Sequence, residues 1–283
     1  MRALFVGLAT IDIIYYSYGF LKEDQKTYAD KQVIIPGGMA SNAAITFAGL
    51  GGNSELWTKI GAKNISDFNQ LEEEYNIQLK VRDYAASDFP GLPVVSILIN
   101  RKNGSRTVLN KPVLHPETEQ IESEISNYDV LMIDGFYPDL TIPAARCARQ
   151  NGIPVVFDSG SWKPGLEHLL QYTDYLIVSK SFRPPGTKSF RSGLDYLADF
   201  DFKGMAFTDG SKPVIAFDHR IEFSLNPQTV KCADTLGAGD VLHGAFCHYL
   251  AKGKEFREAL KSAMNTASFS CSFEGPHTWI KEI

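Results

Sequence analysis

Residues 234–240 (DTLGAGD) place two aspartates on either side of a run of small residues, and an apolar segment of helical period follows directly. The small run therefore lies at the start of a helix, where free N–H groups and the helix dipole favour an anion. A phosphoryl group in transfer develops charge on its oxygens and needs backbone donors that come close. Gly237, Ala238 and Gly239 are candidates for such an anion hole, and Asp240 for the base that accepts a proton from an attacking hydroxyl. The plainer explanation is an acid that only stabilises a helix start, and the adjoining Gly-Ala-Gly run disfavours it.

Two further groups are candidates for ligand contacts. In the segment PGGMASNAA, Gly37 and Gly38 let the backbone turn tightly and approach a ligand, and Asn42 can exchange hydrogen bonds with a polyol. Asp12 follows the first apolar run, and the carboxyl ends of parallel strands are where open α/β sheets bind ligands. Each also has a plainer explanation, because paired glycines occur in loops, asparagine caps helices, and exposed loops often carry acids.

Short apolar runs alternate with longer segments of helical period along the chain. Continuous apolar strands spaced by helices indicate a parallel sheet covered on both faces, so we expect an α/β fold built from βαβ units. The expected strands are residues 4–8, 130–133, 155–157, 175–178 and 205–208, and the expected helices are residues 142–150, 165–172 and 192–198.

Two segments depart from this rhythm. Residues 13–35 are polar and aromatic, and residues 93–111 alternate in period two around Asn103-Gly104, a pair typical of a type I′ hairpin turn. Together they predict a small extra sheet that stands off the main body, whose apolar face needs a ligand, a partner subunit or both as its cover. With no internal repeat or linker, we expect one domain over residues 1–283, with lid segments at roughly 13–35 and 88–112.

Bulk composition excludes several classes of protein. A chain of 283 residues with 44% hydrophobic residues can bury a substantial core. A net charge of −5 and a pI near 5.7 argue against nucleic acid or an anionic membrane as a partner. No segment reaches the ~18 apolar residues that a membrane span needs, and the four cysteines are scattered, so we expect a cytoplasmic protein with free thiols.

Together these motifs resemble the ribokinase-like carbohydrate kinases, also called the PfkB family. The N-terminal signature spans residues 37–61 and the C-terminal signature spans residues 234–247, and the resemblance covers essentially the whole chain in order. It implies a ribokinase-like fold, with a mostly parallel central sheet flanked by helices and a small β-sheet lid over the sugar. Because that lid often forms a dimer contact in the family, we expect a homodimer through the lid sheet.

The resemblance also implies an activity and a set of site residues. The activity is transfer of the γ-phosphoryl group of ATP, with Mg²⁺, to a hydroxymethyl group of a small sugar, with Asp240 as general base and residues 237–239 as the anion hole. The substrate-binding residues that it implies are Asp12, Gly37, Gly38, Asn42, Arg106 and Asn110. The nucleotide-binding residues are Thr208, Gly210 and Asn265. Asp234 occupies a position linked in many members to a monovalent cation, which makes it a candidate K⁺ ligand.

Three departures from the family pattern concern the nucleotide side. Residues 179–182 read SKSF where the family has N-x-x-E, so the carboxylate tied to magnesium is absent, and Lys180 is a candidate to supply charge toward phosphate. The nucleotide loop carries Pro213 where a second glycine is usual, and proline lacks an N–H donor. Residues 61–63 read Gly-Ala-Lys in place of Gly-x-Asp.

Two other functions remain open at this stage. One is a kinase of a nucleoside or a pyridoxal-like alcohol, and the other is an inactive relative that binds a sugar or nucleotide. The Gly-Gly…Asn42 segment and the hairpin favour sugars, and Asp240 with its intact small-residue run favours catalysis. The hairpin sequence GSRT and the tail SCSFEG resemble ketohexokinase-like members, so a ketose is the favoured substrate. A dehydrogenase is disfavoured because no G-x-G-x-x-G follows the first strand.

Overall fold

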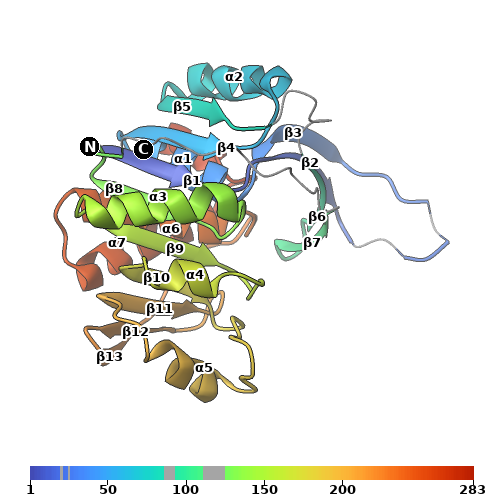
Figure 1. Ribbon diagram of the computed structural model, residues 1–283. Coiled ribbons are helices and arrows are strands. Elements are labelled where there is room, and N and C mark those ends of the chain that lie inside the picture. The colour runs from blue at the N-terminus through green and yellow to red at the C-terminus, as the bar shows by residue number, and fades with distance from the viewer. Residues whose placement is uncertain (20–21, 25, 86–92, 111–124) are drawn as a thin grey trace.

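The computed structural model describes residues 1–19, 22–24, 26–85, 93–110 and 125–283, and these residues form one large and one small sheet (Figure 1). The spatial order of the nine strands of the large sheet is β13 (Ile221–Leu225), β12 (Val214–Asp218), β11 (Gly204–Thr208), β10 (Tyr175–Ser179), β9 (Val155–Ser159), β8 (Val130–Ile133), β1 (Arg2–Val6), β4 (Asn53–Thr58) and β5 (Gln78–Asp83). The seven neighbouring strands β11, β10, β9, β8, β1, β4 and β5 pair in parallel. At the β11 edge, β12 and β13 pair antiparallel. This confirms the predicted α/β fold. No helix among the described residues is long and apolar enough to span a bilayer.

Helices cover both faces of the large sheet because its central strands are apolar on both sides. In β1, Ala3 and Phe5 face one core while Leu4 and Val6 face the other, and all four are fully buried. The first core is closed by α1 (Met39–Gly49), α2 (Ile65–Tyr75), α6 (Ala238–Ala251) and α7 (Phe256–Ser270), and the second by α3 (Pro138–Gln150), α4 (Glu167–Leu170) and α5 (Phe190–Leu197). Figure 1 shows α3 and α4 in front of the sheet and α1, α6 and α7 behind it.

The predicted strands and helices are present, with differences at their ends. The first strand stops at Val6 rather than at residue 8, because the chain turns at Gly7, where a Cβ atom would lie 2.1 Å from the Asp134 carboxylate. Helix α3 begins at Pro138, four residues before the expected start, since proline is well suited to the first turn of a helix. Helix α4 covers only residues 167–170 of the expected 165–172.

The small sheet has the order β3 (Lys31–Gly37), β2 (Thr10–Ser17), β6 (Val94–Asn100) and β7 (Ser105–Asn110) and lies to one side of the large sheet (Figure 1). The predicted two-residue turn at Asn103-Gly104 is wrong. Asn100 pairs with Ser105, so the loop has the four residues 101–104, and of these only Gly104 has a left-handed φ, of 69°. Expected lid residues 20–21, 25, 88–92 and 111–112 lie outside the described residues.

Candidate active site

The candidate base Asp240 lies in the first turn of α6, where that helix meets α1. The Asn42 side-chain amide donates a hydrogen bond to Asp240 Oδ2 at 2.7 Å, and Asn42 Oδ1 accepts one from His277 Nε2 at 2.9 Å. Burial lowers the pKa of His277 to about 3, so its ring is neutral and donates through this one nitrogen. Asn42 was expected to contact the sugar, and the structure places its side-chain amide against the carboxylate of Asp240, the candidate base.

Close packing of α1 against α6 brings these side chains together. A Cβ atom at Gly244 would lie 2.2 Å from the carbonyl oxygen of Ala43, so the two helix backbones touch where only glycine fits. The contact places Asn42 and Asp240 within hydrogen-bond distance although they lie 198 residues apart in the sequence. Helix packing, and not sequence proximity, therefore builds the centre of the site.

The small-residue run forms the beginning of α6, as its sequence predicts. Gly237 is the N-cap with a left-handed φ of 72°, and the first helical hydrogen bond runs from Val241 N to Gly237 O. A Cβ atom at Gly237 would lie 2.7 Å from Pro276, whereas one at Gly239 would meet nothing within 4 Å. Gly237 is therefore required by the backbone, while Gly239 borders open space next to the N–H groups of the first turn.

Asp240 is surrounded by groups that change its proton affinity. Burial and the nearby Asp158 raise the pKa of Asp240 to about 8, although Asn42, His243 and Arg106 act in the opposite direction. Asp158 is the penultimate residue of β9 and is 5% exposed. Because two ionised carboxylates repel each other at short range, Asp240 holds its proton more tightly than an ordinary aspartate.

Asp134, which follows β8, is fully buried and has a structural role. Its carboxylate accepts backbone hydrogen bonds from Leu8, Ala40 and Phe136, so it joins the ends of β1 and β8 to the start of α1. Asp134 and Asp158 were not predicted. Each stands at the carboxyl end of a buried apolar strand, which is the pattern that singled out Asp12, so the same rule would have found both.

Asp12 lies on the inner face of the small sheet, only 5% exposed. Its pKa is raised to about 6 by burial, and Thr10 Oγ1 donates a 2.6 Å hydrogen bond to it. A Cβ atom at Gly37 would lie 2.2 Å from the Asp12 carboxylate, and one at Gly38 would lie 2.5 Å from the Leu8 carbonyl oxygen. The two glycines thus make room for protein groups, and Gly37 in particular makes room for the Asp12 side chain.

The second hairpin strand brings Asn110 and Arg106 to the same face of the small sheet as Asp12. Asn110 pairs with Val95, which pairs with Asp12, so Asn110 and Asp12 share one cross-strand row. Arg106 donates from Nη1 to the carbonyl oxygen and to the hydroxyl of Thr235, at 2.9 and 2.8 Å. Arg106, expected at the substrate, therefore holds the loop before α6 against the hairpin.

The nucleotide-side residues meet at the carboxyl ends of β10 and β11. Ser179 pairs with Thr208, and Lys180 N donates to Thr208 O at 2.7 Å, so the two loops that follow lie side by side. Lys180 Nζ lies 4.0 Å from the Asp209 carboxylate, so the positive charge of Lys180 is partly balanced by Asp209. Gly210 adopts a left-handed φ of 59° in the second loop.

Asn265 lies half-buried on α7, and α7 packs against α6. The role of Asn265 in nucleotide binding stays a prediction.

Asp234 joins three parts of the molecule. Its Oδ1 accepts from Leu236 N at 2.8 Å, and its Oδ2 accepts from Gly275 N at 3.0 Å and from the Tyr16 hydroxyl at 3.1 Å. Both carboxylate oxygens of Asp234 thus accept hydrogen bonds from protein donors. Among the described residues there is no group of three or more His, Cys, Asp or Glu side chains placed to hold a metal ion. Its role as a K⁺ ligand stays a prediction that this hydrogen bonding does not favour.

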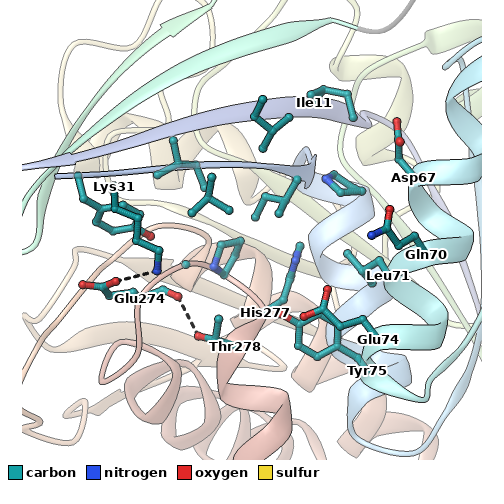
Figure 2. Close-up of a pocket in the computed structure, with 18 residues that line it drawn as sticks. Ile11, Lys31, Asp67, Gln70, Leu71, Glu74, Tyr75, Glu274, His277 and Thr278 are labelled. Atoms are coloured by element: carbon teal, nitrogen blue, oxygen red, sulfur yellow. Dashed lines mark hydrogen bonds and ion pairs between the residues drawn. The ribbon is translucent and has the colours of Figure 1, made fainter. Parts of the chain in front are cut away.

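A cavity of about 450 Å³ adjoins the site at His277. Figure 2 shows the side chains of α2, among them Asp67, Gln70 and Glu74, on one side and the Lys31–Glu274 ion pair opposite them. None of the expected sugar contacts lines this cavity, so the cavity is distinct from the set of substrate-binding residues predicted from the sequence.

Comparison with known proteins gives one family over nearly the whole chain. The family described as "pfkB family carbohydrate kinase" matches residues 2–282. Mouse (Mus musculus) ketohexokinase is 21% identical over 97% of both chains, and a nucleoside kinase of Methanocaldococcus jannaschii is 25% identical over 96% of this chain and 91% of its own.

Solved structures agree with the fold. A putative ribokinase from Agrobacterium tumefaciens superposes with a TM-score of 0.83 at 23% identity, covering 98% of this chain and 93% of its own. Arabidopsis thaliana ribokinase, solved with ribose and ATP, has a TM-score of 0.70 at 19% identity, covering 97% and 93%. At these identities the likeness establishes a ribokinase-like fold and leaves the substrate open.

Proposed function

Because the chain belongs to the pfkB family of carbohydrate kinases, a family of phosphotransferases with an alcohol acceptor, we propose that it transfers the γ-phosphoryl group of ATP to a hydroxymethyl group of a small sugar. The observation that carries this proposal is the contact between Asn42 and Asp240 at the start of α6. A partly buried carboxylate is held at 2.7 Å by an amide, next to helix N–H groups and to the open space at Gly239.

Each step of the transfer has a group suited to it. Asp240 accepts the proton of the attacking hydroxyl, and the N–H groups at the start of α6 stabilise the charge that develops on the phosphoryl oxygens. Asp12 and Asn110 face the sugar from the inner side of the small sheet, which acts as a lid that excludes water from the reaction.

Mg²⁺ enters with the nucleotide in this mechanism. The described residues provide no cluster of acids to hold the ion, and Mg²⁺ commonly keeps several waters and binds substrate phosphates. The ion neutralises charge on the phosphates, while the protein groups position the acceptor hydroxyl and its proton.

A ketose related to fructose is the acceptor that we propose first. Its support is the GSRT hairpin and SCSFEG tail, together with the whole-length similarity to a protein named ketohexokinase. Similarity of the same order to a nucleoside kinase and to ribokinases makes nucleosides and ribose the necessary comparisons. A panel of ketoses, aldoses and nucleosides, with ADP release as the signal, ranks them by kcat/KM.

Asp240→Asn tests the mechanism without knowledge of the sugar. The change keeps the shape and the Asn42 contact but removes the base, so kcat should fall by about 10²–10⁴-fold while nucleotide affinity and thermal stability stay close to those of the wild type. Steady-state kinetics with the best acceptor of the panel measures this. Near-normal turnover of Asp240→Asn would refute the mechanism, and a wild-type protein that no sugar, nucleoside or vitamin stimulates would refute the kinase function.

We also propose that two chains associate through the outer face of the small sheet. Leu109, Ser96, Ile13 and Ile34 form one cross-strand row on that face, and the Leu109 and Ile34 side chains are 74% and 60% exposed. Apolar side chains aligned on an exposed sheet face are typical of an interface.

A further inference from the structure

His243 is a buried histidine one turn after Asp240 on α6, and it has no part in the mechanism above. Its Nδ1 lies 2.7 Å from the carbonyl oxygen of Gly239, and its Nε2 lies 2.8 Å from the carbonyl oxygen of Ile177 in β10. The residue is 4% exposed, so water does not compete for these contacts. Each ring nitrogen therefore faces a group of the protein.

The two contacts are chemically informative because carbonyl oxygens only accept hydrogen bonds. A neutral imidazole has one N–H and one lone pair, so it would satisfy one carbonyl and turn a lone pair toward the other. Both contacts are favourable only when both nitrogens carry a proton. Burial has the largest effect and lowers the pKa of His243 overall, whereas both carbonyl contacts and the neighbouring Asp240 favour the charged ring.

A counter-charge is present at the right place. Asp158 Oδ2 lies 3.3 Å from His243 Nδ1, and among the described residues no other hydrogen bond to the Asp158 side chain is found. Burial raises the pKa of Asp158, the nearby Asp134 after β8 raises it further, and Lys163 from the loop after β9 lowers it. Asp240 faces Asn42 from α1 and Arg106 from β7 in addition to Asp158 and His243.

We propose that His243 is an imidazolium ion paired with Asp158 and that it is a positioning residue for phosphoryl transfer. The hydrogen bond from His243 fixes the orientation of the Gly239 carbonyl. The peptide plane that contains this carbonyl lies in the first turn of α6, which faces the phosphoryl group in the proposed mechanism. His243 also balances the charge of Asp158, so that this carboxylate repels the Asp240 carboxylate less strongly. The positioning role rests on the function proposed above; the protonation of the ring does not.

The consequence of losing the cation follows from its burial. Without His243, the Asp158 carboxylate would lie unpaired beside Asp240. A buried charge that loses its partner destabilises its surroundings far more than the pair stabilised them. A misplaced anion hole and an unbalanced negative charge should both reduce turnover of ATP.

Nitrogen NMR of histidine-labelled wild-type protein tests the protonation directly. At pH 7.5 we expect both ring nitrogens of His243, assigned by through-bond correlation, to have N–H chemical shifts. His248 is the internal control, since it lies buried on the same helix, burial lowers its pKa to about 4, and its Nδ1 is without a hydrogen-bond partner among the described residues. A lone-pair nitrogen on His243 at this pH would overturn the proposal.

Kinetics of His243→Gln and His248→Gln test the positioning role. We expect His243→Gln to lower kcat/KM for ATP about tenfold or more, since small displacements of catalytic groups have large effects on rate, and His248→Gln to stay within about twofold. Wild-type kinetics of a folded His243→Gln would overturn the positioning role. The NMR measurement needs neither turnover nor a variant, so it stands even if His243→Gln fails to fold or if Asp240→Asn refutes the proposed base.

Discussion

At the scale of single residues, the proton affinity of Asp240 sets the pH range of the reaction. Burial and Asp158 raise its pKa to about 8, and the proposed base acts only as a carboxylate. Below that pKa the side chain is protonated and inactive as a base, so kcat/KM should rise with pH and reach its plateau above about 8. The pKa of Asp240 is shifted upward because burial and a neighbouring negative charge disfavour the ionised form of an acid.

Asp158→Asn separates the effect of that neighbour from the effect of burial. The variant removes the carboxylate that raises the pKa of Asp240, so the acidic limb of the kcat/KM profile should move to lower pH. A pH profile of kcat/KM for the sugar measures the shift, with Asp195→Asn, an exposed acid on α5, as control. An unmoved acidic limb in Asp158→Asn would show that Asp158 does not affect the base.

At the scale of elements, the contact between α1 and α6 holds the site together. Gly244→Ala would force a methyl group to within 2.2 Å of the Ala43 carbonyl oxygen, so the helices must separate. Overpacking of this kind destabilises a protein by about 1–3 kcal/mol, and we expect a loss of that order in the free energy of unfolding together with weaker activity, because Asn42 moves away from Asp240.

Gly193→Ala is the matched control for this change. Gly193 also lies inside a helix, but a Cβ atom there meets only Pro184, at an ordinary 3.6 Å. Alanine is favoured over glycine in a helix by up to about 1 kcal/mol, so Gly193→Ala should leave stability equal or slightly higher in urea unfolding. Equal stability of the two variants would contradict the close helix contact.

The elements themselves could be predicted from the sequence because their signals are local. Buried parallel strands are continuous apolar runs, and the Gly-Ala-Gly run before an apolar helical segment marks the start of α6. The hairpin loop was predicted wrongly at Asn103-Gly104, since the pairing of Asn100 with Ser105, which depends on both whole strands, sets the loop length.

The site could be predicted only in part, for the same reason. Asp240 and Asn42 stand in motifs with recognisable spacing, but His277 contacts Asn42 across 235 residues and His243 contacts Ile177 across 66. Neither histidine has a neighbour in sequence that reveals its partner. Their roles depend on helix packing and on strand order, which the spacing of residue types does not encode.

At the scale of the whole molecule, the small sheet contacts both the site and solvent. Its inner side is tied to the body through Arg101–Glu274 and Lys31–Glu274 ion pairs and through Arg106 and Thr235. Ion pairs that are partly exposed contribute little to stability, so these two pairs add little to the attachment of the sheet.

The outer side of the sheet gives a prediction about assembly. Leu109→Glu should disrupt the proposed association, because a charge would replace an apolar side chain that is 74% exposed in the single chain. Sedimentation velocity should give a dimer for the wild type and a monomer for this variant. Ile221→Glu is the control, because Ile221 is 71% exposed on the edge strand β13 of the large sheet. A monomeric wild type, or a dimer that survives Leu109→Glu, would contradict the interface.

The 198-residue separation between Asn42 and Asp240 has a consequence for biosynthesis. A ribosome makes the chain from its N-terminus, so α1 is synthesised long before α6, against which it packs. His277, which contacts Asn42, is synthesised after both helices. A nascent chain that ends just before residue 238 contains the residues of every strand of the large sheet but lacks the candidate base and α6. We therefore expect the proposed kinase activity only from chains that extend past His277.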